Sequence, residues 1–330
     1  MLVVLDKGKH WDHAMTDAVE DILAGMIAGN PPRSRSLIVS VYGDAILPHG
    51  GEIWLGGLMR LVAPFGLGER VVRTAVFRLV QDGILASDRR GRKSFYTLTE
   101  TGRRHFESAQ RRIYALAECA WDGSWLLVLA GAGIDGADRA ALRRELGWQG
   151  FAETAPGVFL HPGGEADLVR ATLHGLGLDG RAVLFSARNA EVEGGAGQEV
   201  ALAALARNAW DLSSIDVQYR QFLERFAPLA SAVERADGVQ PEAAFVARVL
   251  LVHEYRRALL KDPSLPAALL PEGWSGTKAT ALARGLYLRL AQPAERHLEA
   301  VAAEGEGEFA PLAAGFARRF GGLSLDRAAE

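Results

Sequence analysis

The sequence predicts an α+β protein of 330 residues with more than one domain. Three observations favour this class. A helix with one polar face is followed by a basic hairpin between Asp82 and Thr99. Alternating strand and helix patterns then run from Trp121 to about Glu193. From there to the end of the chain the pattern is almost wholly helical. The length suits two or three domains.

Composition excludes several classes of protein. Apolar residues make up 49% of the chain and charged residues 23%, as in an ordinary soluble globular protein. We find no apolar run long enough to cross a bilayer, and the N-terminus lacks the pattern of a secretory signal. Cys119 is the only cysteine, which excludes an intrachain disulfide and a cysteine-based zinc site. We therefore expect a cytoplasmic protein that binds no membrane, no metal and no cofactor.

The net charge of −3 conceals an uneven distribution. Between Gly68 and Arg112 there are 11 Lys and Arg against 5 Asp and Glu, whereas the rest of the chain has 26 against 35. Positive charge concentrated in one segment is typical of a surface that binds phosphate groups.

Four elements are predicted before Gly68. Spacing of apolar residues predicts a helix from His10 to Ile27, which Asn30-Pro31-Pro32 ends. A second helix is expected from Ser36 to about Leu47, then a short strand at Glu52–Leu55 and a helix at Leu55–Val62.

The next helix, Glu69 to Gln81, has one apolar face and one polar face. The polar face presents Arg70, Arg73, Thr74, Phe77 and Arg78. The hairpin that follows has four positive charges at its tip, where like charges repel, so we do not expect the tip to stabilise the fold. This order is typical of a winged helix-turn-helix, in which a helix enters the major groove and the hairpin holds phosphate. The predicted contacts to double-stranded DNA are Arg70, Arg73, Thr74, Phe77, Arg78, Arg89, Arg90, Arg92, Lys93 and Ser94.

After an arginine-rich helix from Thr99 to about Glu118, the pattern becomes β-α-β-β-α-β. Its strands are expected at Trp125–Leu129, Trp148–Thr154, Gly157–His161 and Ala182–Ser186, and its helices at Asp138–Leu146 and Glu165–Leu176. This order predicts a ferredoxin-like domain. Small sheets of this kind often expose one face or one edge to a partner.

The segment Gly131–Gly136 fits G-x-G-x-x-G between a strand and a helix, which raises the alternative of a nucleotide-dependent enzyme. Two observations disfavour it. The strand after the helix is short and polar, and Asp135 and Asp138 place negative charge where a phosphate would bind. A nuclease would require metal-binding carboxylates at the strand ends, where Asp135 alone is weak support. We expect a structural turn and no enzyme.

The C-terminal region contains expected helices at Glu199–Asn208, Ile215–Arg235, Pro241–Lys261, Thr277–Glu304 and Phe309–Phe320. Within the third of these, His253-Glu254-Tyr255-Arg256-Arg257 follows an apolar run. Polar side chains on a buried helix must pair with each other or with a ligand. The segment is thus either a structural ion-pair network or a pocket whose guanidinium groups hold phosphate or carboxylate, with Arg220 contributing from a neighbouring helix.

Three segments together resemble one known family. They are DGILASDRRGRKSFYTLTETGRRHF, the strand WLLVL, and HEYRRALLKDPSLPAALLPEGWSG, in an arrangement that spans about Ser36 to about Gly276. They are similar to the repressors of phenylacetate-degradation operons, the PaaX family. The resemblance implies a dimer with a winged helix, a ferredoxin-like domain akin to the Cas2 fold and a helical C-terminal domain. It also implies release from operator DNA by an aryl-acyl-CoA thioester such as phenylacetyl-CoA.

The resemblance suits a pocket that combines arginines with aromatic side chains, because coenzyme A is a polyphosphate joined to an apolar acyl group. The expected effector contacts are His253, Tyr255, Arg256, Arg257, Arg220, Tyr219 and Trp274. The expected domains are an N-terminal extension at 1–33, the winged helix with its linker helix at 34–118, a ferredoxin-like dimerisation domain at 119–195 and an effector-binding helical domain at 196–330.

Overall fold

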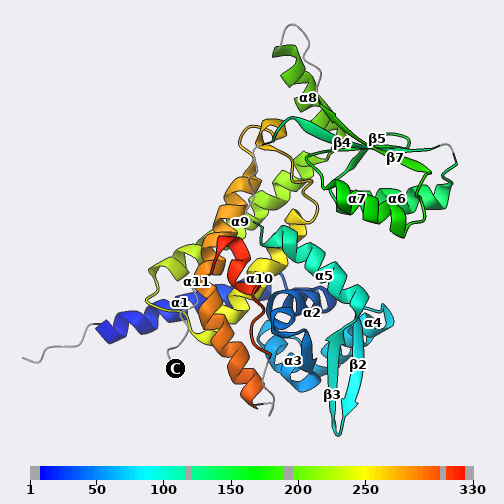
Figure 1. Ribbon diagram of the computed structural model, residues 1–330. Coiled ribbons are helices and arrows are strands. Elements are labelled where there is room, and N and C mark those ends of the chain that lie inside the picture. Colours follow the sequence, from blue (N-terminus) through cyan, green and yellow to red (C-terminus); the bar gives the residue numbers. More distant parts are fainter. Residues whose placement is uncertain (1–7, 116–120, 132, 189–195, 305–309, 324–330) are drawn as a thin grey trace, which may run out of the picture. The chain divides into compact units, whose positions relative to one another are not determined.

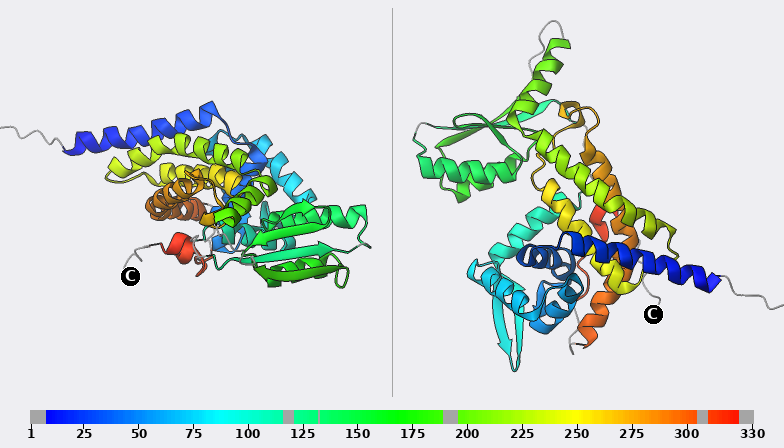
Figure 2. Two further views of the ribbon diagram at one scale, coloured as in Figure 1. Left: turned by 90° about the horizontal axis from the view of Figure 1, so that it is seen from above. Right: turned by 180° about the vertical axis from the view of Figure 1, so that it is seen from behind.

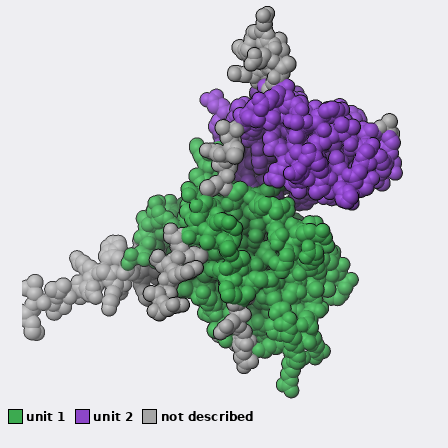
Figure 3. Space-filling model, in the orientation of Figure 1, with its two compact units in different colours: residues 1–116, 220–257, 277–330 green, residues 117–219, 258–276 purple. Residues whose placement is uncertain are grey.

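The computed structural model describes residues 8–115, 121–131, 133–188, 196–304 and 310–323, so Cys119 lies outside the described residues. The chain divides into two compact units (Figure 3). The first contains residues 1–116, 220–257 and 277–330, and the second contains residues 117–219 and 258–276. The expected domain boundaries stay a prediction. Among the described residues, no helix combines the length and apolar character needed to cross a membrane.

The first unit begins with the helices and strands of a winged helix (Figure 1). Helix α1 (Gly8–Gly29) runs beside the later part of helix α9 (Leu212–Arg235), as Figure 2 shows. Arg225 of α9 donates a hydrogen bond of 2.9 Å to the carbonyl of Met26. The elements that follow are α2 (Ser34–Val41), β1 (Glu52–Trp54), α3 (Leu55–Val62), α4 (Glu69–Gln81), β2 (Leu85–Arg90), β3 (Lys93–Leu98) and α5 (Glu100–Ile113). The three strands form an antiparallel sheet in the order β1-β3-β2, which confirms the winged helix-turn-helix prediction.

The expected helix from Ser36 to Leu47 is not regular throughout. Its α-helical part, α2, ends at Val41, and the chain continues as a π-helical turn, Tyr42–Ile46, and a 3-10 turn, Leu47–His49. The wider turn carries Asp44, whose carboxylate accepts hydrogen bonds from Tyr114 and Tyr287. Such turns interrupt helices where a side chain has a particular role.

Long helices complete the first unit. They are the later part of α9, α10 (Pro241–Leu259) and α11 (Ser275–Glu304). The prediction that α10 is buried is confirmed, since its apolar side chains from Ala243 to Val252 are all enclosed. The expected helix Phe309–Phe320 is wrong in extent: residues 310–315 are not helical, and only a 3-10 segment forms at Phe316–Gly321. Two residues explain its irregularity, because Arg319 has extended backbone angles and Phe320 a left-handed φ of 51°.

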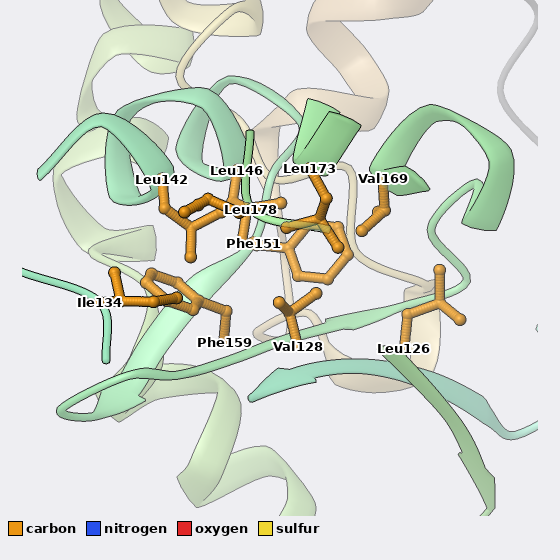
Figure 4. Packing of buried hydrophobic residues seen from close by; sticks show 10 residues of the cluster. All are labelled: Leu126, Val128, Ile134, Leu142, Leu146, Phe151, Phe159, Val169, Leu173 and Leu178. Carbon is orange, nitrogen blue, oxygen red and sulfur yellow. The ribbon is translucent and has the colours of Figure 1, made fainter. Parts of the chain in front are cut away.

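The second unit has the ferredoxin-like arrangement that the sequence predicts. Its elements are β4 (Ser124–Ala130), α6 (Gly136–Trp148), β5 (Ala152–Ala155), β6 (Val158–Pro162), α7 (Ala166–Gly175), β7 (Ala182–Arg188) and α8 (Ala196–Ala209). The strands lie in the order β5-β6-β4-β7, and each neighbouring pair is antiparallel. Helices α6 and α7 cover one face through the apolar cluster in Figure 4, and α8 packs on the other face around Trp125 and Leu160.

The turn at Gly131–Gly136 has a structural explanation, and Ala132 within it lies outside the described residues. Both neighbours of β4 run antiparallel to it, whereas a dinucleotide-binding unit requires a parallel neighbour. The Asp135 carboxylate accepts the Asp138 N–H at 2.9 Å and so caps α6. A Cβ at Gly131 would lie 2.7 Å from the carbonyl oxygen of Arg181. Close packing and helix capping account for this motif, and the antiparallel neighbours of β4 disfavour the alternative of a nucleotide-dependent enzyme.

Candidate nucleic-acid interface

Helix α4 is amphipathic because its apolar residues recur every three or four positions. Val72, Ala75, Val76 and Leu79 are buried against the rest of the winged helix. The opposite face is exposed, and it carries all five of the residues predicted to contact DNA from this helix: Arg70, Arg73, Thr74, Phe77 and Arg78. Phe77 is 63% exposed, which is unusual for so large an apolar side chain on a folded helix. This face is suited to reading base edges.

The wing, the β2–β3 hairpin, closes through a two-residue turn at Gly91 and Arg92, because Arg90 pairs with Lys93 in register. Gly91 has φ of 61° at the first turn position, which fits a type II′ turn and favours glycine. Arg89 and Arg92 are exposed at the tip, and Ser94 lies opposite Arg89. The turn thus presents these arginines to solvent.

Arg90 departs from the expectation that the basic tip does not stabilise the fold. Its guanidinium donates two hydrogen bonds of 2.7 Å to Glu52 on β1 and one of 2.8 Å to Asp88, and it lies 4.6 Å from the ring centroid of Phe95. Hydrogen bonding, first to Glu52 and then to Asp88, raises the pKa of Arg90. The expectation is wrong for Arg90 because two carboxylates offset the repulsion that the hairpin sequence alone suggests.

Other predicted contacts also have partners within the protein. Arg73 forms an ion pair with Glu69 one helical turn earlier, and the Thr74 hydroxyl donates a hydrogen bond of 2.9 Å to the carbonyl of Arg70. Lys93 lies 5.4 Å from the ring centroid of Trp54. To contact DNA, the Arg73 guanidinium would have to leave the Glu69 carboxylate and pair with a base or a phosphate.

Three elements of the winged helix are joined at one point. The Thr99 hydroxyl donates a hydrogen bond of 2.6 Å to the carbonyl of Gly83, and the Thr99 N–H donates one of 3.0 Å to Ile84. A Cβ at Gly102 would lie 2.3 Å from the Ile84 carbonyl oxygen, so only glycine fits there. The end of α4, the base of the wing and the start of α5 are therefore fastened to one another. Sequence reasoning placed Thr99 and Gly102 at a helix start but did not find this junction.

Two residues of the HEYRR segment are held by the winged helix itself. The Nδ1 atom of His253 is 2.9 Å from the Ser40 hydroxyl, and Arg256 donates a hydrogen bond of 2.9 Å to the same oxygen. Arg256 also donates to the carbonyl and the hydroxyl of Ser36, at 3.0 and 2.8 Å. Burial, followed by the charge of Arg256, lowers the pKa of His253 to about 3, so the imidazole is neutral at pH 7. These contacts fasten α10 to α2.

The other members of the segment are also paired. Glu254 lies 3.2 Å from both Arg225 and Arg257, and Tyr255 shares a hydrogen bond of 2.9 Å with Thr280. Of the two interpretations of this segment, the geometry favours the structural network.

The remaining predicted effector residues are Tyr219 and Arg220 on α9 and Trp274 directly before α11. The Tyr219 hydroxyl donates a hydrogen bond of 2.7 Å to Asp262, and its ring lies edge-on to Trp274 with centroids 5.7 Å apart. Arg220 is exposed. Tyr219 and Trp274 belong to the second unit, whereas Arg220 and the HEYRR residues belong to the first. The seven predicted effector residues are thus divided between two units.

Known proteins similar to this chain identify its family. Family models match three successive parts of it: a PaaX-like protein at residues 33–102, a PaaX protein central Cas2-like domain at 118–201 and a PaaX-like protein C-terminal domain at 210–300. The chain is also 40% identical over 303 residues to the transcriptional repressor PaaX of Escherichia coli (strain K12), covering 91% of this chain and 93% of that protein. The chain belongs to the PaaX family.

Membership of the PaaX family confirms the resemblance seen in the three sequence segments. PaaX proteins are regulators, which supports the prediction that this chain is not an enzyme. Among solved structures, the chain is similar to the uncharacterized protein Rv0674 from Mycobacterium tuberculosis, with 27% identity and a TM-score of 0.43 over 73% of this chain and 89% of that one.

Proposed function

We propose that this PaaX-family chain is a cytoplasmic transcriptional repressor that binds operator DNA as a homodimer. The observation that carries the proposal is the exposed polar face of α4 beside a basic hairpin. A helix fits the major groove, where base pairs present distinct patterns of hydrogen-bond donors and acceptors. Membership of a family that includes the Escherichia coli transcriptional repressor supports the same function.

The two parts of the interface have different tasks in this proposal. Arg70, Arg73, Thr74, Phe77 and Arg78 on α4 read bases or adjoining phosphates. The wing residues, Arg89, Arg90, Arg92, Lys93 and Ser94, hold the DNA backbone, which contributes affinity without sequence preference. Arg90 is also needed to order the wing, because it joins β2 to β1.

Dimer formation is assigned to the ferredoxin-like sheet. Strand β7 is an edge strand among the described residues, and it pairs there only with β4. Its central part has neither Lys nor Pro, which commonly protect an edge, and its Val183 and Phe185 side chains are 53% and 47% exposed. A second copy would place two α4 helices on one duplex, as a two-fold operator requires.

The operon and the effector rest on the family resemblance. We propose an aromatic-catabolism operon and an aryl-acyl-CoA effector such as phenylacetyl-CoA. Contacts from His253, Tyr255, Arg256, Arg257, Arg220, Tyr219 and Trp274 to this effector stay a prediction. The hydrogen bonds of His253 and Arg256 to α2 compete with that role.

Fluorescence anisotropy with DNA from upstream of the chain's own gene tests the proposal. We expect Arg70→Ala to weaken binding by about 1–3 kcal/mol and to reduce the preference at one base pair, while Arg144→Ala, an exposed arginine on α6, leaves binding unchanged. Added phenylacetyl-CoA should release the wild-type protein, and acetyl-CoA should release it less. Equal affinity of the wild type for shuffled DNA would refute an operator-specific repressor.

A further inference from the structure

A cavity in the first unit contains none of the residues predicted to contact DNA or the effector. It has a volume of about 450 Å³ and lies between α5, the Leu47–Pro48 turn and the C-terminal 3-10 segment. Helix α5 contributes one face, with residues spaced three or four positions apart. These are Arg103, Glu107, Gln110 and Arg111, and Tyr114 follows directly after the helix.

The lining of the cavity has an excess of positive charge. Arg103, Arg111 and Arg318 contribute three cations against the single carboxylate of Glu107. Arg319 also lines it, but its guanidinium is paired with the buried carboxylate of Asp44. Across the described parts of the chain, no carboxylate lies within ion-pair distance of Arg111 or Arg318. Both side chains are exposed and available to an anion.

The inner part of the cavity is apolar. Phe316 is buried, as is the ring of Tyr114, and Leu47 and Pro48 complete the wall. A volume of this size is ordinary for a small-molecule site, and such sites combine apolar walls with a few polar groups that orient the ligand. The lining thus suits a molecule with an apolar body and an anionic group.

We propose that this cavity binds a small organic anion, with a phosphate or a carboxylate joined to an apolar body, and that its occupancy controls DNA binding. Guanidinium groups recognise both kinds of anion through paired hydrogen bonds. The inference rests on the proposed repressor function, and it places the effector on α5 instead of on the HEYRR segment of α10.

The cavity is connected to the DNA-binding elements through α5. The first turn of α5 is fastened to the end of α4 and the base of the wing by Thr99 and Gly102. Further along, Gln110 donates a hydrogen bond of 2.6 Å to the carbonyl of Gly43. A ligand between α5 and the 3-10 segment changes the position of α5, and the junction transmits that change to both α4 and the wing.

The opposite wall of the cavity is held in place. The N–H of Ala313 donates a hydrogen bond of 2.8 Å to the carbonyl of Pro48, and the N–H of Phe320 donates one of 2.9 Å to the carbonyl of Tyr114. A bound ligand therefore contacts a segment that is hydrogen-bonded both to the Leu47–Pro48 turn and to the end of α5. This makes binding and the position of α5 interdependent.

Calorimetric titration of the full-length protein tests the inference. Three probes distinguish recognition of phosphate from recognition of carboxylate. Free coenzyme A carries phosphate groups, phenylacetate carries a carboxylate, and phenylacetyl-CoA carries phosphate groups joined to the apolar aryl group. Arg111→Glu and Arg318→Glu should each weaken binding of the recognised probe by about tenfold or more, because each replaces an attractive charge with a repulsive one. The control is Arg104→Glu, on the same helix but outside the cavity and 68% exposed, which should bind the probe like the wild type.

The possible outcomes test the cavity assignment separately from the proposed repressor function. Coenzyme A binding that both cavity variants weaken supports phosphate recognition, and phenylacetate binding that both weaken supports carboxylate recognition. If phenylacetyl-CoA binds all four proteins equally and still releases operator DNA, the cavity assignment is overturned while the repressor function stands. Binding of no probe by a wild type that binds operator overturns the cavity and the effector together. Operator affinity without ligand, measured for each variant, shows that the winged helix remains folded.

Discussion

Arg90 and Arg92 have the same charge and lie two positions apart, yet their surroundings differ. Arg90 is held by Glu52 and Asp88, whereas Arg92 occupies the second position of an exposed turn. A guanidinium that already pairs with two carboxylates releases fewer counterions from DNA than an exposed one. The two side chains should therefore affect DNA binding in different ways.

We expect Arg92→Ala to reduce the slope of log Kd for the operator, plotted against log salt concentration, by about one. Arg90→Ala should change that slope less but weaken the wing, since β2 loses its ionic link to β1. The measurements are operator affinity across a salt series and hydrogen exchange of the β3 amides. Normal protection of β3 in Arg90→Ala, with a slope change as large as that of Arg92→Ala, would contradict this assignment.

His253 makes stability depend on pH. Its pKa of about 3 in the folded protein lies below the ordinary value of 6.5, first because it is buried and then because Arg256, Arg257 and Arg225 are nearby. Below pH 6.5 the unfolded chain takes up a proton that the folded protein does not. The stability contributed by neutral His253 is thus complete above pH 6.5 and is lost as the pH falls toward 3.

Urea unfolding at pH 7 and pH 5 measures this effect. Between these two values the wild type should lose about 2 kcal/mol more stability than His253→Gln, whose amide can still bond to Ser40 without titrating. Equal losses in the two proteins would show that His253 takes up its proton in the folded state.

At the scale of elements, a buried ionic network joins helices that are distant in sequence. Arg248 on α10 is fully buried and forms ion pairs with Asp44, in the π-helical turn, at 2.9 Å, and with Glu295, on α11, at 2.5 Å. Burial alone would lower the pKa of Arg248, but the two carboxylates reverse this and raise it. The network holds the winged helix against the long C-terminal helices.

Removing one member of such a network leaves buried charges without a counterion. We expect Arg248→Met to destabilise the protein by about 3–5 kcal/mol. Arg289→Met, which removes an exposed pair with Glu234 on the same helical scaffold, should cost less than about 1 kcal/mol. Urea unfolding of both variants gives the comparison, and a similar small loss in each would show that the network contributes little.

For the whole molecule, the proposed function requires two copies of the chain for operator recognition. If the β7 edge joins them, Phe185→Lys should reduce the dimer fraction at micromolar concentration and weaken operator binding by tenfold or more, in proportion to the loss of dimer. Leu168→Lys changes an exposed apolar residue on α7 of the same unit and should leave the dimer intact. Sedimentation velocity with anisotropy on the same samples measures both quantities. A Phe185→Lys protein that remains dimeric would exclude this edge.

The amino-acid sequence by itself determined the local architecture. Periodic apolar residues placed α3 and α4 at the bounds observed, and the strand and helix order of residues 124–188 was enough for the ferredoxin-like fold. It also predicted the exposed face of α4 and the tip of the wing, because these depend on residues close together in the chain. The family follows from the sequence as well.

Only the tertiary structure decided which charged residues have partners. Arg90 meets Glu52 from 38 positions away, Arg256 meets Ser40 from 216 positions away, and the α5 cavity combines residues near 48, 110 and 316. Helical and strand periods report which face of an element is buried, but they carry no information about which distant side chain faces it. The interaction between two charges depends on their separation in space and not on their separation along the chain. The roles of these arginines therefore depend on how the chain packs.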